Sequence, residues 1–116
     1  MEKKVQIGML CEIYGNLLTK RQLNILNDYC NKELSFAEIA ENNKITRQAV
    51  NDIVKKGESK LLEYEQKLGI MKKTIDQEKQ IQNILSELSK ITDNSSDKKV
   101  EKILNSVRKE LISLNA

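Results

Sequence analysis

The 116-residue chain lacks proline, histidine and tryptophan altogether, and it has only four glycines and one phenylalanine. The absence of proline and the scarcity of glycine remove the two residues that most often interrupt helices. Leucine, isoleucine, lysine, glutamate, glutamine and asparagine dominate the rest of the composition. Because aromatic side chains are also few and apolar residues recur at helical spacing, we predict an all-α fold.

The lack of histidine also limits chemistry, because it removes the commonest general base and the commonest metal ligand. The sequence contains no glycine-rich phosphate loop and no carboxylate cluster with the spacing of a metal-binding loop. Cys11 and Cys30 lie among apolar neighbours, which is typical of reduced thiols that pack in a core. The sequence therefore predicts no catalytic residue, no metal site and no cofactor, and a protein that is not an enzyme.

Long apolar runs are missing as well, and none approaches the about 20 residues needed to span a bilayer. The first ten residues, MEKKVQIGML, carry charges that a signal peptide would not place there. We therefore expect a cytoplasmic protein without a membrane partner. The net charge of +3, from 20 basic and 17 acidic residues spread along the chain, is compatible with nucleic-acid binding but does not require it.

Helix-capping residues divide the first part of the chain. We expect helices over residues 2–14, from Thr19, from Ser35, and from 47 to 68. Gly15 is expected to end the first helix in the left-handed conformation, and Gly69 to end the last. Ser35 is followed three residues later by Glu38, which is the pattern of a capping box.

The second part of the chain reads as a helical hairpin. Apolar residues recur at helical spacing on both sides of a polar turn over residues 92–97. These apolar stripes need to be covered. They could pack against each other, against the first helices or against a second copy of the chain. We predict a helix-turn-helix domain over 1–69 and a helical C-terminal extension over 70–116, which packs on that domain or forms a dimer seam.

The stretch SFAEIAENNKITRQAV has the features of a helix-turn-helix corner. Ala40 supplies the small residue where two helices touch, ENNK supplies the turn, and Ile45 is an apolar plug beneath it. Thr46 is a suitable N-cap for the second helix. Since no glycine is present in the turn, we expect Asn42 or Asn43 to take the left-handed conformation.

Polar side chains around this corner are candidates for nucleic-acid contact. Glutamine and asparagine can pair with adenine, arginine can pair with guanine, and lysine can meet phosphates. The candidate residues are Lys20, Arg21, Lys44, Thr46, Arg47, Gln48, Asn51, Lys55, Lys56 and Lys60. Two acidic residues interrupt this set, and of these Asp52 is expected to repel phosphate or to pair with Lys55 or Lys56.

The residues LLTKRQLNIL and LSFAEIAENNKITRQAV resemble region 4 of bacterial sigma factors, with a basic helix start, an S-aromatic-x-E-I-A segment and the following I-T-R. The run RQAVNDIVKKGESKLLEYEQKLGI is more similar still to the YlxM-like family of small bacterial proteins. The resemblance covers about residues 5–70. It implies a sigma region-4-like helix-turn-helix bundle, which the C-terminal hairpin follows, and a link to the signal recognition particle, whose genes usually lie beside those of the family.

Two functional hypotheses follow. The first is a helix-turn-helix DNA-binding regulatory protein, dimeric through its C-terminal helices and acting in the signal recognition particle pathway. The alternative is an accessory module of the protein-targeting machinery that binds a protein or the RNA of that particle without reading a DNA sequence. A continuous positive face across Lys20, Arg21, Arg47 and Lys55 would favour nucleic acid, whereas interruption by Asp52 and Glu58 would favour a protein partner.

Overall fold

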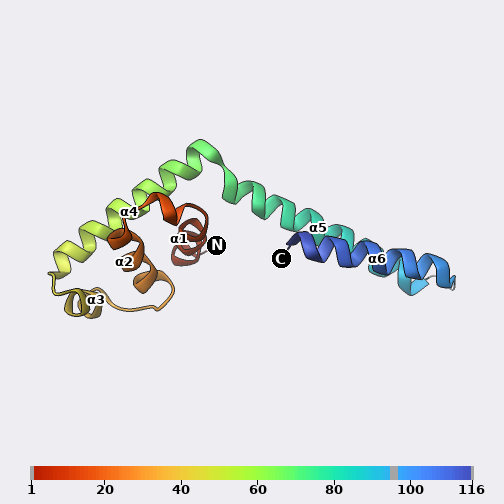
Figure 1. The fold of residues 1–116 in the computed structure, drawn as a ribbon, viewed down its shortest axis with the longest axis horizontal. Coiled ribbons are helices and arrows are strands. Elements are labelled where there is room, and N and C mark those ends of the chain that lie inside the picture. The colour runs from red at the N-terminus through yellow and green to blue at the C-terminus, as the bar shows by residue number, and fades with distance from the viewer. Residues whose placement is uncertain (1, 95–96, 116) are drawn as a thin grey trace. The chain divides into compact units, whose positions relative to one another are not determined.

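The computed structural model describes residues 2–94 and 97–115, and all of the regular structure within them is helical. The elements are α1 (Lys3–Tyr14), the short 3₁₀ helix η1 (Gly15–Leu17), α2 (Lys20–Cys30), α3 (Phe36–Asn43), α4 (Arg47–Leu68), α5 (Ile70–Asn94) and α6 (Lys98–Asn115) (Figure 1). The predicted all-α class is confirmed. The polar turn expected over 92–97 includes Ser95 and Ser96, which lie outside the described residues.

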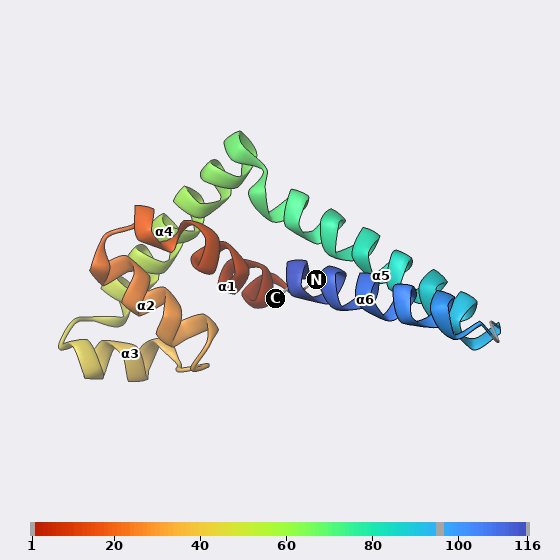
Figure 2. The same cartoon turned by 45° about the vertical axis from the view of Figure 1, so that its right-hand side comes forward.

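The chain divides into two units, Met1–Met71 and Lys72–Ala116. In the first unit, α1, α2 and α3 gather along one side of the long helix α4, and each of them contacts it (Figures 1 and 2). The core of this unit consists of apolar side chains from all four helices. Its fully buried members are Ile7, Leu10, Tyr14, Ile25, Leu26, Ile39, Val50 and Leu61.

Side-chain caps begin three of these helices at the predicted residues. The Thr19 hydroxyl accepts from the Gln22 backbone N–H at 3.2 Å, and the Gln22 side chain accepts in return from the Thr19 N–H. Ser35 and Glu38 make the same reciprocal pair, which confirms the predicted capping box. Thr46 caps α4 by accepting from the N–H of Ala49 at 3.0 Å. Each cap satisfies N–H groups that the helix itself leaves unpaired.

Gly15 does not take the left-handed conformation that its position after a helix indicated. Its φ of −56° and ψ of −33° are right-handed, and it begins η1. A Cβ atom at Gly15 would lie 2.8 Å from Cδ1 of Leu23, well inside van der Waals contact. Glycine at this position therefore gives room to the Leu23 side chain of α2 and is not needed for the backbone conformation.

The corner between α3 and α4 differs from the expected turn in which residue is left-handed. Helix α3 continues to Asn43, whose side-chain amide donates to the carbonyl oxygen of Ile39 at 2.8 Å. Lys44 takes the left-handed conformation, with φ 55° and ψ 44°, so the expectation that Asn42 or Asn43 would do so is wrong.

The Lys44 N–H donates to Glu41, and the Ile45 N–H donates to Ala40 at 3.0 Å. These are the two hydrogen bonds of a Schellman motif, which requires a left-handed residue directly after the last helical one.

The second unit contains most of α5 and all of α6, which lie side by side in both views (Figures 1 and 2). The predicted C-terminal hairpin is confirmed. Within it, the guanidinium of Arg108 donates to the Ser89 hydroxyl at 3.0 Å, and Ile81 is buried. Many apolar side chains of this unit stay exposed, namely Ile84, Ile91, Val100, Ile103, Val107, Ile112 and Leu114.

The left-handed conformation at Lys44 predicts an unusual stability response. Lys44→Gly should raise the free energy of unfolding by about 0.5–1 kcal/mol, because glycine adopts this conformation without the steric cost of a Cβ. Asn43→Gly should lower it by about 1 kcal/mol, because Asn43 is helical and donates to Ile39. Chemical denaturation of both variants measures the difference. A loss of stability in Lys44→Gly would contradict the assigned turn.

Candidate nucleic-acid interface

Helix α4 has one face in the core and one face in solvent. Val50, Val54, Gly57 and Leu61 are buried, at the spacing of three and four residues that defines one side of a helix. The opposite ridge consists of exposed side chains, namely Gln48, Asp52, Lys55 and Ser59. The helix that follows the corner at Lys44 therefore presents polar side chains to solvent along its first three turns.

The candidate contact residues all lie in the first unit. Nine are exposed and Asn51 is half-buried. The exposed ones are Lys20 and Arg21 in the first turn of α2, Lys44 and Thr46 in the corner, and Arg47, Gln48, Lys55, Lys56 and Lys60 on α4. Among the described residues, none of the seven basic ones forms an ion pair. Their charges are therefore available to a ligand.

The two acidic residues between Arg47 and Lys60 on α4 have different surroundings. Glu58 is turned toward α1, where its carboxylate lies 3.7 Å from the Lys3 ammonium and its side chain is only 17% exposed. Asp52 stays on the exposed ridge and accepts from the side-chain amide of Gln48 at 3.2 Å. Of the two alternatives expected for Asp52, the ion pair with Lys55 or Lys56 is not formed, and repulsion of phosphate stays a prediction. The negative charge that remains on the exposed ridge in the first half of α4 is that of Asp52.

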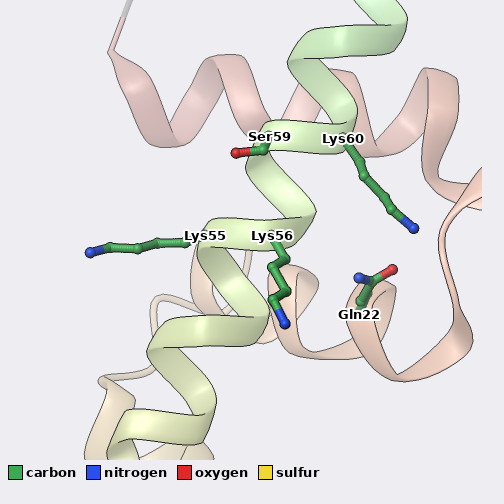
Figure 3. Close-up of a pocket in the computed structure, with 5 residues that line it drawn as sticks. All are labelled: Gln22, Lys55, Lys56, Ser59 and Lys60. Carbon is green, nitrogen blue, oxygen red and sulfur yellow. The ribbon is translucent and has the colours of Figure 1, made fainter.

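A shallow pocket opens where α4 passes α2. It is lined by Gln22, Lys55, Lys56, Ser59 and Lys60. Figure 3 shows Lys56 and Lys60 pointing to the side on which Gln22 lies, whereas Lys55 and Ser59 point away from it. Lys56 and Lys60 are four residues apart, so they lie one above the other on the helix surface.

Sequence reasoning did not include Gln22 among the site residues. The signal was present, because Thr19 and Gln22 have the spacing of a capping box, which fixes a glutamine side chain at a helix start.

The close approach of the two helices depends on Gly57. A Cβ atom at this position would lie 2.6 Å from Cδ1 of Leu26, and Leu26 is fully buried and cannot move aside freely. Leu26 is one turn beyond Gln22 on α2, while Gly57 lies between Lys56 and Lys60 on α4. The crossing at Gly57 therefore brings Gln22 next to the two lysines.

The two cysteines are not part of this surface. Cys11 is buried and Cys30 is half-buried, and both are free thiols. Burial, together with the neighbouring Cys30, raises the pKa of Cys11 from 9.0 to about 11. Burial also raises the pKa of Cys30. Thiols with raised pKa values are poor nucleophiles near neutral pH, which agrees with a packing role.

Within residues 2–94 and 97–115 no group of His, Cys, Asp and Glu side chains has the arrangement of a metal site. None of the described helices is long and apolar enough to cross a membrane.

A model of the UPF0122 family, described as "Putative helix-turn-helix protein, YlxM / p13 like", matches residues 1–111. The chain belongs to this family. Two similar relatives are UPF0122 proteins from Clostridium botulinum, 46% identical over 76% of this chain and 81% of the relative, and from Clostridium perfringens strain 13, 36% identical over 97% and 99%. A third, from Clostridium kluyveri, is 37% identical over 90% of this chain and 95% of the relative.

The predicted YlxM-like membership and the helix-turn-helix are thus confirmed. The residues that the UPF0122 family model matches include the corner at Lys44, the pocket beside Gly57, and nearly all of the C-terminal hairpin.

The crossing at Gly57 makes a testable prediction. Gly57→Ala should lower the free energy of unfolding by about 1–3 kcal/mol through overpacking against Leu26, even though alanine is the better helix former. Gly8→Ala is the matched control on α1, where the nearest atom to an added Cβ is the side-chain oxygen of the exposed Asn31 at 3.3 Å. Thermal unfolding should show a drop for Gly57→Ala alone, and equal effects would argue against the close crossing.

Proposed function

We propose that the protein is a DNA-binding regulatory protein that places the first turns of α4 in the major groove of a duplex. The observation that carries this proposal is the cluster of basic side chains around the corner, which are exposed and form no ion pair among the described residues. The family description as a helix-turn-helix protein supports it.

Arg47, Asn51 and Gln48 are the side chains proposed to reach base edges. Arg47 and Asn51 lie in the first two turns of α4, where a recognition helix meets bases. Gln48 must first exchange its hydrogen bond to Asp52, so Arg47 and Asn51 are the stronger candidates. Lys55 would then contact a phosphate from the same exposed side of the helix.

The C-terminal hairpin is proposed to pair two copies of the chain. On α6, Val100, Ile103, Val107 and Leu114 are exposed and follow heptad positions a, d, a and a. On α5, Ile84 and Ile91 are exposed and seven residues apart. A four-helix bundle of two hairpins would cover these stripes, and a dimer would present two recognition helices to two half-sites.

The finer role that we propose is regulation in the signal recognition particle pathway, in the cytoplasm. The competing function is an accessory module that binds a protein or the RNA of that particle. Asp52 on the exposed ridge favours a protein partner, since it repels phosphate and can meet a basic side chain. The two functions require different residues, so one pair of variants separates them.

Arg47→Ala combined with Lys55→Ala should weaken duplex binding roughly tenfold or more and lower the salt dependence of the affinity by about one phosphate contact. Lys102→Ala with Lys109→Ala on α6 removes the same charge and should leave the affinity nearly unchanged. Fluorescence anisotropy with a labelled duplex near 50 mM salt measures both.

An unchanged affinity in the first variant, or no binding by the wild type, would contradict the DNA-binding proposal. Retention of particle protein or RNA on the immobilised chain, unaffected by Arg47→Ala with Lys55→Ala, would favour the accessory function instead.

The dimer makes a separate prediction. Val107→Lys places a charge within the proposed seam and should convert a dimer to a monomer in sedimentation analysis. Asn105→Lys adds the same charge on another side of α6, because two residues turn a helix by about 200°, and should stay dimeric. A monomeric wild type at the concentration of the DNA measurements would overturn the proposed pairing.

A further inference from the structure

The pocket beside Gly57 is lined by side chains that can donate hydrogen bonds to an anion. Its α2 side is Gln22, whose side-chain oxygen is already occupied by the backbone N–H of Thr19 at 3.2 Å. This hydrogen bond fixes the orientation of the amide, and its NH₂ group is left as a donor. Figure 3 shows that the Gln22 nitrogen is directed toward the side of Lys56.

The α4 side of the pocket adds two ammonium groups. Lys60 points toward Gln22 and Lys56 lies on the same side of α4 (Figure 3), and neither forms an ion pair among the described residues. The N-terminus of α2 begins within the same turn as Gln22, and the aligned peptide dipoles of a helix add partial positive charge at that end. Neutral and charged donors from two different helices therefore line the same pocket.

We propose that Gln22, Lys56 and Lys60 hold one phosphate group between α2 and α4. The tetrahedral oxygens of a phosphate accept several hydrogen bonds at once, and the two lysines neutralise its charge. The ligand source assigned here is a backbone phosphate of nucleic acid, and this part rests on the proposed DNA-binding function. The phosphate chemistry of the pocket does not rest on it.

Because α2 and α4 cross closely at Gly57, a phosphate bound in this pocket would contact both helices. The lysines approach the phosphate from α4 and the amide approaches it from α2, so a bound phosphate would span both helices. A contact of this kind fixes the position of a protein on a duplex without reading a base. Lys55 and Ser59 line the same pocket but point the other way, so they are not part of the phosphate site.

Gln22→Glu tests the site without removing the cap. Glutamate at this position can still accept from the Thr19 N–H, since capping boxes use either residue. The donor is lost, however, and a negative charge faces Lys56 and Lys60. Asn24→Asp is the matched control, because it adds the same charge at an exposed position of α2 that does not line the pocket.

In the first arm, the full chain is titrated with inorganic phosphate at constant ionic strength and followed by nitrogen-15 NMR. The side-chain amide signal of Gln22 should shift in the wild type and in Asn24→Asp, and the backbone signals of Lys56 and Lys60 should shift with it. In Gln22→Glu the shifts of Lys56 and Lys60 should be lost. Absence of these shifts in the wild type, or their persistence in Gln22→Glu, would overturn the phosphate site.

In the second arm, the same proteins are titrated with a labelled duplex. Gln22→Glu should weaken binding at least fivefold more than Asn24→Asp does, and equal losses would overturn the assignment to a backbone phosphate. If inorganic phosphate binds at Gln22 while the wild type binds no duplex, the proposed function fails. The phosphate site then stands, with free phosphate or a phosphate monoester as its source.

Discussion

The close crossing of α2 and α4 at Gly57 is the constraint on which the first unit depends. Helix α4 contacts α1, α2 and α3, and Leu26 on α2 occupies the space that a side chain at Gly57 would need. If the helices stood further apart, Leu26 would lose its buried position and a cavity would open, which is costly in a closely packed core. The same close approach places Gln22 beside the lysines of α4, so the packing of the core and the arrangement of the surface have one origin.

The charge on the outer surface is likewise shaped by packing. Glu58 and Lys55 are three residues apart in sequence, but the buried stripe of α4 turns Glu58 toward α1 and leaves Lys55 in solvent. The net charge of the chain is small, yet the basic side chains near the corner remain unpaired among the described residues. A weak overall charge is therefore compatible with a locally basic surface, because tertiary contacts withdraw one of the opposing charges and leave Asp52 alone on the ridge.

Local signals in the sequence predicted most of the first unit. The caps at Thr19, Ser35 and Thr46, the span of α4 and the left-handed Gly69 all depend on neighbouring residues in the chain, and each is present. Two expectations about which residue takes the left-handed conformation failed for different reasons. Gly15 is right-handed and gives room to the Leu23 side chain, a contact across helices, and Lys44 takes a conformation that sequence preference assigns to asparagine or glycine.

Sequence alone determined the helical class, the capped helix-turn-helix corner and the family resemblance, because periodicity and capping act over three or four residues. It also predicted that the site would lie near Arg47 and Lys55, although which side chains contact a ligand stays a prediction. Only the tertiary structure decided that Gln22 joins Lys56 and Lys60, and that Glu58 turns toward Lys3. The physical reason is that these neighbours lie on different helices, and their meeting depends on how closely glycine at position 57 lets two backbones approach.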